Sequence, residues 1–477
     1  MQPDIIFIDS FCGAGGVSEG ARMSGVARVV AAINHDPIAI KSHTFNHPHT
    51  CHFIEDIRTC PLGDLVDIVS DARRKYPKAL VMFWASLECT QFSKAKGGKS
   101  RLADSRMLAW ALPRYIQALQ PDLVGIENVE EFMGWGDLDE RGRPICRRNG
   151  FEYMRWIKGI CAMGYTHDWR ILNAADFGAY TSRERYFGVF HRPHIRHAWP
   201  QPTHASRRQK GSMFPDARSP WKPVSDVLDF SDLGRSLFDR SKTIVDKTLV
   251  RVLKGLTKFI DQPLLMTCNT PGYCSPLNRP SGTITTRGHK ALVTPILQTY
   301  YNNGGSTPMS QPAPTITTKD RICLVSAFIV NPQYRNNGRS IMSPAPTVIA
   351  SQKSNPLGLA VATYGPEKWT DQPSDSATMR ELKAFMRANG IADIYLRMLK
   401  VDELKRIQGF PADYVLLGTQ EQQKKFIGNA VVPAIVSAWM KAIAHVHNQP
   451  HYTCTSTPHS SATSAAMPKP APSKVAG

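Results

Sequence analysis

A single cysteine, Cys89, stands where a buried strand is expected to end. The apolar run from Ala79 to Trp84 has the length and composition of a buried strand, and small and polar residues follow it. In an open α/β sheet, ligands lie beyond the carboxyl ends of the strands, so a thiol here could act as a nucleophile. Free cysteine is also among the most buried residue types, and Cys89 could equally fill space in a core.

Other groups that could do chemistry follow neighbouring strands. The apolar run 122–126 is expected to form a strand that leads into Glu127, and in a parallel sheet this carboxylate faces the same pocket as the thiol. Arg183 and Arg185 alternate in an extended segment, so their guanidinium groups share one face and could clamp a phosphate or a base carbonyl. The alternative is that Glu127 is an ordinary solvated residue at a strand end and that Arg183 and Arg185 are ordinary surface arginines.

The N-terminal segment has the local pattern of a nucleotide-type ligand site. A short strand, 5–8, precedes a glycine-rich turn and a helix predicted over 17–23, and glycines let the backbone approach a ligand closely. Two further strands end in polar side chains that could accept hydrogen bonds from a ribose and an adenine amino group. The candidate cofactor residues are Phe11, Gly13, Gly15, Gly16, Asn34, Asp36, Asp56 and Ile57.

Composition limits the class of protein. The chain has 477 residues, with 58 Lys and Arg against 39 Asp and Glu, and this net charge of +19 favours a nucleic-acid partner. The ten cysteines include no Cys-x-x-Cys pair and no zinc-like grouping with histidine, so we expect neither a metal site nor a disulfide scaffold. No apolar run approaches ~18 residues, so we expect a soluble protein of a reducing compartment without membrane association.

Three stretches after the first domain differ in composition. Residues 191–220 are rich in His, Pro, Arg and Lys, and a Pro-rich β-type motif recurs every 32 residues at Thr283, Thr315 and Thr347, which predicts three similar β-units. We expect one helix to begin at Val401 and a later, apolar helix to end near His447. We therefore expect a catalytic and cofactor-binding domain at 1–195, a β-rich region at 196–390, a return to the first domain at 391–447, and a disordered tail at 448–477.

The set and order of these motifs resemble the DNA (cytosine-5)-methyltransferases of phage and bacteria. The resemblance covers most of residues 4–447. It is carried by the glycine loop 11–16, by Cys89 with Phe92-Ser93, by Glu127-Asn128-Val129, by Arg183-Glu184-Arg185, and by Gly428-Asn429-Ala430-Val431.

This resemblance implies a Rossmann-like, S-adenosylmethionine-dependent methyltransferase sheet, with a β-rich target-recognition domain inserted before the C-terminal helix. It implies that Cys89 attacks ring carbon 6 of a flipped-out cytosine in double-stranded DNA, that Glu127 assists at ring nitrogen 3, and that Asn429 closes the cofactor pocket. A monomer in the cytoplasm of a bacterial or phage-infected cell is expected, with a cognate restriction endonuclease as a further partner. An RNA cytosine methyltransferase and an inactive DNA-binding homologue are the alternatives.

Three positions depart from the family pattern. Asn34 stands where an acidic residue usually binds the ribose, so either Asn34 accepts this hydrogen bond more weakly or Asp36 replaces it. Glu88 replaces the proline before the nucleophile, and a carboxylate beside the thiol disfavours the thiolate if it points inward. Tyr180 and Thr181 replace the usual Pro-Gln before the arginines.

Overall fold

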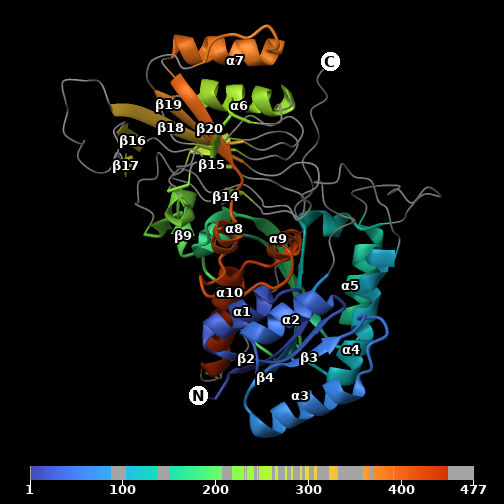
Figure 1. Cartoon of the computed structure of the whole chain (residues 1–477). Coiled ribbons are helices and arrows are strands. Elements are labelled where there is room, and N and C mark those ends of the chain that lie inside the picture. Colours follow the sequence, from blue (N-terminus) through green and yellow to red (C-terminus); the bar gives the residue numbers. More distant parts are fainter. Residues whose placement is uncertain are drawn as a thin grey trace, which may run out of the picture.

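The computed structural model describes most of the chain outside the repeat region. The described residues are 2–87, 104–136, 150–206, 217–229, 231–232, 234–240, 244, 246–259, 369–389, 391–449 and the backbone of short strands between 264 and 364. They form two lobes, and each lobe contains one of the two largest sheets (Figure 1). Cys89, Glu88, the loop 93–101, the cores of the three repeats and residues 450–477 lie outside the described residues.

The lower lobe in Figure 1 is built on a seven-stranded sheet with the order β3-β2-β1-β4-β5-β8-β6. Strands β1 to β5 are parallel, and β8 runs antiparallel to both β5 and β6. The order reverses between β1 and β4, which is where an open α/β sheet binds its ligands. The strands are β1 Ile5–Ser10, β2 Ala27–Asn34, β3 Cys51–Ile54, β4 Leu80–Ser86, β5 Leu123–Asn128, β6 Thr166–Asn173 and β8 Glu184–His191.

Helices cover both faces of this sheet, as the near-continuous apolar strands require. In β1, Ile6 and Ile8 pack into a cluster with α3, α4 and α5, whereas Ile5 and Phe7 pack into a second cluster with α1 and α10. Each fully buried side chain of this kind stabilises the fold by roughly 1.5–3 kcal/mol. The helices are α1 Gly16–Ser24, α2 Pro37–Asn46, α3 Gly63–Lys75, α4 Leu112–Leu119, α5 Phe151–Cys161 and α10 Pro433–Asn448.

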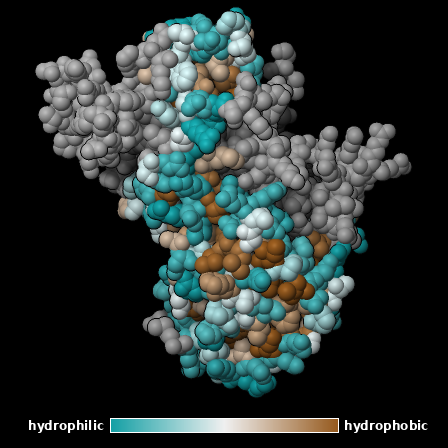
Figure 2. All heavy atoms as spheres, in the orientation of Figure 1, coloured by the Kyte–Doolittle hydropathy of each residue, from teal (hydrophilic) through white to brown (hydrophobic). Residues whose placement is uncertain are grey.

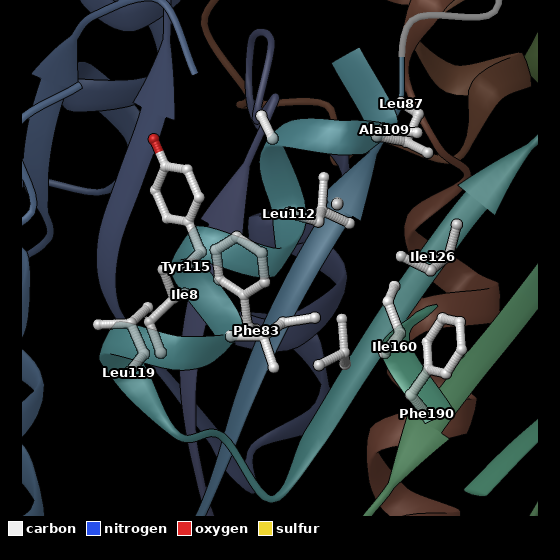
Figure 3. Packing of buried hydrophobic residues seen from close by; sticks show 14 of the residues in the cluster. Ile8, Phe83, Leu87, Ala109, Leu112, Tyr115, Leu119, Ile126, Ile160 and Phe190 are labelled. Carbon is white, nitrogen blue, oxygen red and sulfur yellow. The ribbon is translucent and has the colours of Figure 1, made fainter. Parts of the chain in front are cut away.

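The first cluster fixes the end of β4, the strand that leads towards Cys89. Figure 3 shows side chains of β1, β4 and β5 packed against α4, with Leu87 at the top of the cluster. The rings of Phe83 and Tyr115 stack with their centroids 5.3 Å apart, and the Tyr115 hydroxyl donates to the carbonyl of Ile57 at 2.9 Å. This packing fixes the ends of these strands up to Leu87, the last described residue before the gap.

The last helix returns to the first strands of the chain. The rings of Trp439 in α10 and Trp84 in β4 meet edge to face at 5.5 Å, and a Cβ atom at Gly20 would lie 2.5 Å from the carbonyl oxygen of Pro433. Within the described residues, the stretch Gln420–Asn448 is the one long and apolar enough to cross a membrane by composition. Its most apolar window is 67% buried inside the protein, as in the core helix of a globular fold.

The upper lobe contains a six-stranded antiparallel sheet, β11-β20-β19-β18-β16-β17, together with α6 Asp246–Phe259 and α7 Ala377–Ala388. Smaller sheets pair β13-β12-β15, β10-β9 and β14-β7. The strands of the large sheet are β11 Arg235–Ser236, β16 Ile296–Thr299, β17 Ser306–Pro308, β18 Ile322–Val330, β19 Gly358–Tyr364 and β20 Ile391–Arg397. The others are β7 Thr181–Ser182, β9 His204–Ala205, β10 Ser219–Pro220, β12 Leu264–Met266, β13 Cys274–Pro276, β14 Ser281–Gly282 and β15 Ala291–Leu292.

Strand β20 pairs along its length with β19, so residues 391–397 continue the upper sheet. The chain returns to the lower lobe only with α8 Val401–Gln408 and α9 Gln420–Asn429. Figure 2 shows apolar side chains gathered over the middle of the visible face, around α2, α8 and α9, whereas its two ends are mainly hydrophilic. The core of the upper lobe continues into these helices and reaches Ala14 of the glycine loop.

A buried ion pair ties together the two segments that cross between the lobes. Arg397 ends β20, and its guanidinium binds Glu403 of α8 at 2.8 Å while donating to the carbonyl of Asp229 at 2.5 Å. Lys400 reaches the carboxylate of Asp229 at 2.7 Å from the other side. The outgoing and returning segments are thereby fixed to one another next to α8.

Candidate active site and cofactor pocket

A cavity of about 380 Å³ lies at the carboxyl ends of β1, β2, β4 and β5. Its size suits a small organic cofactor, for which pockets of roughly 300–1,000 Å³ are typical. The sequence-predicted residues that line it are Phe11, Gly13, Gly16, Asn34, Asp36, Asp56, Ile57, Glu127, Arg183 and Asn429. Arg185 and Gly15 are not among the lining residues, and Cys89 is outside the described residues.

The glycine loop is shaped both for the cavity and for close packing. Gly13 has a φ of +52° with no atom near its missing Cβ, so it leaves open space at the cavity. A Cβ at Gly15 would lie 2.2 Å from the hydroxyl oxygen of Tyr414, and a Cβ at Gly16 would lie 2.5 Å from the carbonyl oxygen of Val431. Gly15 and Gly16 therefore admit the C-terminal segment, a role that the sequence reading did not assign to them.

Glu127 is held between two arginines at the buried end of β5. Its Oε1 lies 3.5 Å from Nε of Arg185, and Arg183 donates to the carbonyl of Gly428 at 3.2 Å. Burial raises the pKa of the Glu127 carboxyl above its usual value, although both arginines act in the opposite direction. Both arginines lower the pKa of Glu127 through their charge, so both guanidinium groups lie near its carboxyl.

The chain leads from β4 towards Cys89 at the same edge of the sheet. Ser86 at the end of β4 is paired in register with Glu127 in the parallel strand β5, and both residues line the cavity. Asn128 donates to the carbonyl of Leu87 at 3.5 Å, so the two strand ends are also in contact beyond the ladder. Cys89 follows Leu87 by two residues in the sequence and lies outside the described residues.

Asp36 caps a helix at the opposite side of the cavity. Its Oδ1 accepts hydrogen bonds from the backbone of Ile38 at 3.0 Å and of Ala39 at 3.2 Å, at the start of α2. Its Oδ2 lies 3.5 Å from Nζ of Lys425 in α9. The Oδ1 of Asn34 in turn accepts from the backbone N–H of Asp36 at 2.9 Å. Both side chains are thus committed to holding this turn.

Asp56 forms an ion pair with Arg58, two residues further on. The shortest distance is 2.6 Å, between Oδ2 and Nη2. Hydrogen bonds from the Arg58 side chain lower the pKa of Asp56 to about 2, so the carboxyl is ionised. Asp56 remains at the cavity wall, where an ionised acceptor suits an adenine amino group.

The motif Gly428-Asn429-Ala430-Val431, here named the late motif, also lies at the cavity. Asn429 ends α9 and lines the cavity, while Gln408 donates to the carbonyl of Ala430 at 2.6 Å and fixes the turn that follows. Lys425, one helical turn before Asn429, also lines the cavity. Its spacing of four residues from Asn429 was the sequence signal that would have found it.

Asp9 is a further buried carboxyl near the pocket that the sequence reading missed. Its Oδ2 accepts from the Ser18 hydroxyl at 2.6 Å, and burial raises its pKa to about 7. Its place directly before the glycine loop, at the end of β1, was the available signal.

Within the described ranges, His, Cys, Asp and Glu side chains form no group of three or more that could hold a metal ion.

Comparison with known proteins decides the family. The model of the family described as C-5 cytosine-specific DNA methylase matches residues 5–219 and 294–445. The chain belongs to this family. Its members methylate carbon 5 of cytosine in DNA from S-adenosylmethionine through a covalent cysteine adduct, and the chain is an enzyme of this class. The cavity suits that cofactor, with glycine backbone at one side and polar strand ends at the other.

Several curated relatives of this methyltransferase are bacterial type II enzymes. It is 28% identical over 231 residues to the type II methyltransferase M.AquIA of Picosynechococcus sp., a match that spans 46% of this chain and 86% of the relative. It is 30% identical over 258 residues to M.XorII of Xanthomonas oryzae pv. oryzae, across 52% of this chain and 53% of that relative. The chain therefore spans most of the first relative and about half of the second.

A solved structure supports the fold. The Entamoeba histolytica methyltransferase EhMeth aligns with a TM-score of 0.50 and 12% identity, over 94% of this chain and 100% of that chain. The predicted Rossmann-like methyltransferase sheet is confirmed, and so are the family and its cofactor. The relatives give no support to the RNA-directed or the inactive alternative.

Proposed function

We propose that Cys89 is the nucleophile and Glu127 the acid of this methyltransferase, acting on a flipped-out cytosine within one specific duplex sequence. The observation that supports this most is Glu127 itself. It is a buried carboxyl with a raised pKa, between two guanidinium groups, in register with the strand that leads to Cys89. Perturbed carboxyls of this kind are characteristic of catalytic acids.

The chemistry requires both residues. Carbon 5 of cytosine is a poor nucleophile, and addition of the Cys89 thiolate to carbon 6 places electron density on it. Protonation or hydrogen bonding of ring nitrogen 3 by Glu127 makes this addition easier, as general acid catalysis. Bound S-adenosylmethionine supplies the methyl group that carbon 5 takes up. Loss of the proton from carbon 5 and expulsion of the Cys89 thiolate then restore the aromatic ring.

The two arginines have separable parts in this proposal. Arg185 contacts Glu127 at 3.5 Å and holds the orientation of its carboxyl. Arg183 lines the cavity and donates to Gly428, so it joins the acid to the late motif. The guanidinium of Arg183 or of Arg185 stabilises negative charge. That charge is on the carbonyl oxygen of the base or on the Cys89 thiolate. Glu88, beside the nucleophile, would disfavour the thiolate if its carboxylate points inward.

The substrate must leave the DNA stack. Flipping a cytosine costs roughly a few kcal/mol, which contacts to phosphates and to the orphan base offset. The net charge of +19 suits phosphate contacts. We place target recognition in the upper lobe, with its C-terminal boundary after Arg397, because β20 belongs to that sheet. Residues 220–293 fall outside the family match, as a variable specificity region would.

The remaining expectations are also proposals. The type II relatives support a cognate restriction endonuclease as a partner in the same cell and a cytoplasmic location. A monomer is sufficient, because the cavity, Glu127 and both arginines come from one chain. The residues 1–195 with 398–447 would form the catalytic and cofactor-binding unit.

The test is expression in a host that lacks cytosine methylation, followed by bisulfite sequencing of the host DNA. Methylcytosine confined to one short motif is the expected result, and it would name the target. A Cys89→Ser variant should bind duplex DNA and leave the genome unmethylated. Methylation at parental levels by this variant would rule out Cys89 as the nucleophile.

A further inference from the structure

On one side of the cavity, four side chains with amide or carboxylate oxygens follow two adjacent strands. Asn34 and Asp36 follow β2, and Glu55 and Asp56 follow β3. Strands β2 and β3 are parallel and pair Asn34 with Ile54. The backbone N–H of Glu55 donates to the carbonyl of Asn34 at 3.1 Å, so Glu55 lies directly beside the residue that departs from the family pattern.

Three of the four side chains are already committed to the protein. The Asn34 oxygen accepts from the Asp36 backbone, which leaves its amide NH₂ as a donor to a ligand. The Asp36 carboxylate caps α2 and faces Lys425. The Asp56 carboxylate binds the Arg58 guanidinium through both oxygens, and it is the acceptor expected for the adenine amino group.

Glu55 is the acid that remains. Its carboxylate makes no hydrogen bond or ion pair with any residue of the described structure, yet the residue lines the cavity. A ribose presents two hydroxyls as donors, and charged acceptors form the stronger hydrogen bonds with them. Asn34 supplies only a neutral acceptor, and its one oxygen already accepts a hydrogen bond from the Asp36 backbone.

We propose that Glu55 is the ribose acceptor of the cofactor site and replaces the acidic side chain that is missing at position 34. The anionic group has moved from the end of β2 to the end of the neighbouring strand β3. Asn34 then serves as the complementary donor, while Asp36 holds the turn between them. Glu55 thereby determines affinity for the adenosine half of the cofactor without touching the transferred methyl group.

Calorimetric titration with two ligands tests this role without any methyl transfer. The ligands are S-adenosylhomocysteine and its 2′,3′-dideoxy analogue, which lacks the ribose hydroxyls. The parent enzyme should bind the hydroxylated ligand at least about tenfold more tightly. Glu55→Gln should weaken binding of S-adenosylhomocysteine by about tenfold to hundredfold and leave binding of the analogue nearly unchanged.

Two further variants control the result. Asp67→Asn removes the same charge from an exposed position on α3 outside the cavity, and it should bind both ligands as the parent does. Asn34→Glu in the Glu55→Gln background restores an acid at the usual position and should recover the preference for the hydroxylated ligand.

Two results would overturn the role of Glu55. One is a Glu55→Gln enzyme that keeps the parental ratio of affinities. The other is an equal loss for both ligands, which would indicate a general charge effect. If the parent itself bound neither ligand, the cofactor assignment would fall as well, so the two failures are distinguishable. Thermal unfolding of each variant verifies that the fold is intact.

Discussion

The two sides of the cavity use the same pair of chemical groups, and the pKa of the carboxyl shifts in opposite directions on the two sides. On the catalytic side, the side chain of Glu127 is 7% exposed and lies beside Arg185, which is 11% exposed, and the pKa of the carboxyl is raised. On the cofactor side, Asp56 is 38% exposed beside Arg58 at 41%, and its pKa is lowered to about 2. A neighbouring guanidinium alone therefore does not decide the direction in which the pKa of a carboxyl shifts in this enzyme.

Burial makes the difference. Removing a carboxylate from water disfavours its charged form, and at Glu127 this penalty exceeds the attraction of two arginines. At Asp56, water remains and direct hydrogen bonds from Arg58 prevail. The raised pKa of Glu127 favours its protonated form, which the proposed role as an acid requires. The cofactor side keeps an ionised acceptor, Asp56, at a partly exposed edge of the cavity.

Replacement of Glu127 is expected to have the largest effect. Glu127→Gln keeps the size of the side chain and a hydrogen-bond donor but cannot transfer a proton, so kcat should fall by about 10²- to 10⁴-fold. Binding of S-adenosylhomocysteine should change little, because the cofactor edge is left intact. Radiolabelled methyl transfer and calorimetry measure the two quantities.

Glu130→Gln is the matched control for this variant. Glu130 begins the short helix after β5 and is exposed, so the same chemical change there should leave kcat at the parental value. A fall in kcat of similar size in both variants would remove the distinction between the buried and the exposed acid.

The second expectation concerns the packing that holds the two sides together. Gly16→Ala would place a Cβ 2.5 Å from the carbonyl oxygen of Val431, and backbone atoms cannot move aside cheaply. We expect a loss of stability of about 1–3 kcal/mol, measured by urea unfolding. Gly63→Ala, where no atom lies within 4 Å, should be close to neutral. Equal stability of the two variants would mean that the late motif does not depend on contact with the glycine loop.

The sequence predicted the strand ends better than the hydrogen bonds between them. Glycine spacing, apolar runs and strand order were sufficient to place Gly13, Glu127 and Arg183 around one cavity. The cap formed by Asp36 was also readable, because an Asp directly before a Pro is a common helix start. The sequence could not predict that the Glu55 carboxylate lacks a partner among the described residues. This depends on the partners that Asp56 and Asn34 bind in the folded protein.

The domain boundary shows a second limit of the sequence. The segment 391–397 was assigned to the returning part of the chain, whereas β20 completes the upper sheet beside β19. Its partner strand β19 begins more than thirty residues earlier, at Gly358, and β pairing over such a distance leaves no local pattern in the sequence. The three repeat cores remain a prediction, because they lie outside the described residues.

A third expectation extends the comparison to a buried carboxyl that has no guanidinium beside it. The pKa of Asp9 is raised from 3.8 to about 7 by burial, so the folded state binds a proton that the unfolded state releases. The stabilising effect of that proton is present below pH ~4 and is lost as pH rises to about 7. Asp9→Asn should therefore be less dependent on pH over this window in urea unfolding. A parallel pH profile for the parent and the variant would show that burial alone does not raise the pKa.

The smallest effect is expected at the exposed pair. Arg58→Ala removes the partner of Asp56, and because both side chains are well solvated the loss of stability should not exceed ~1 kcal/mol. The pKa of Asp56 is depressed in the folded state, so this contribution is present above pH ~4 and disappears as pH falls towards 2. Unfolding at pH 7 and pH 2 should thus show a small difference between parent and variant only at the higher pH, and added salt should reduce it. A loss of several kcal/mol would place this ion pair in the same class as the buried one at Glu127. The contrast between the two sides of the cavity would then have to rest on something other than solvent.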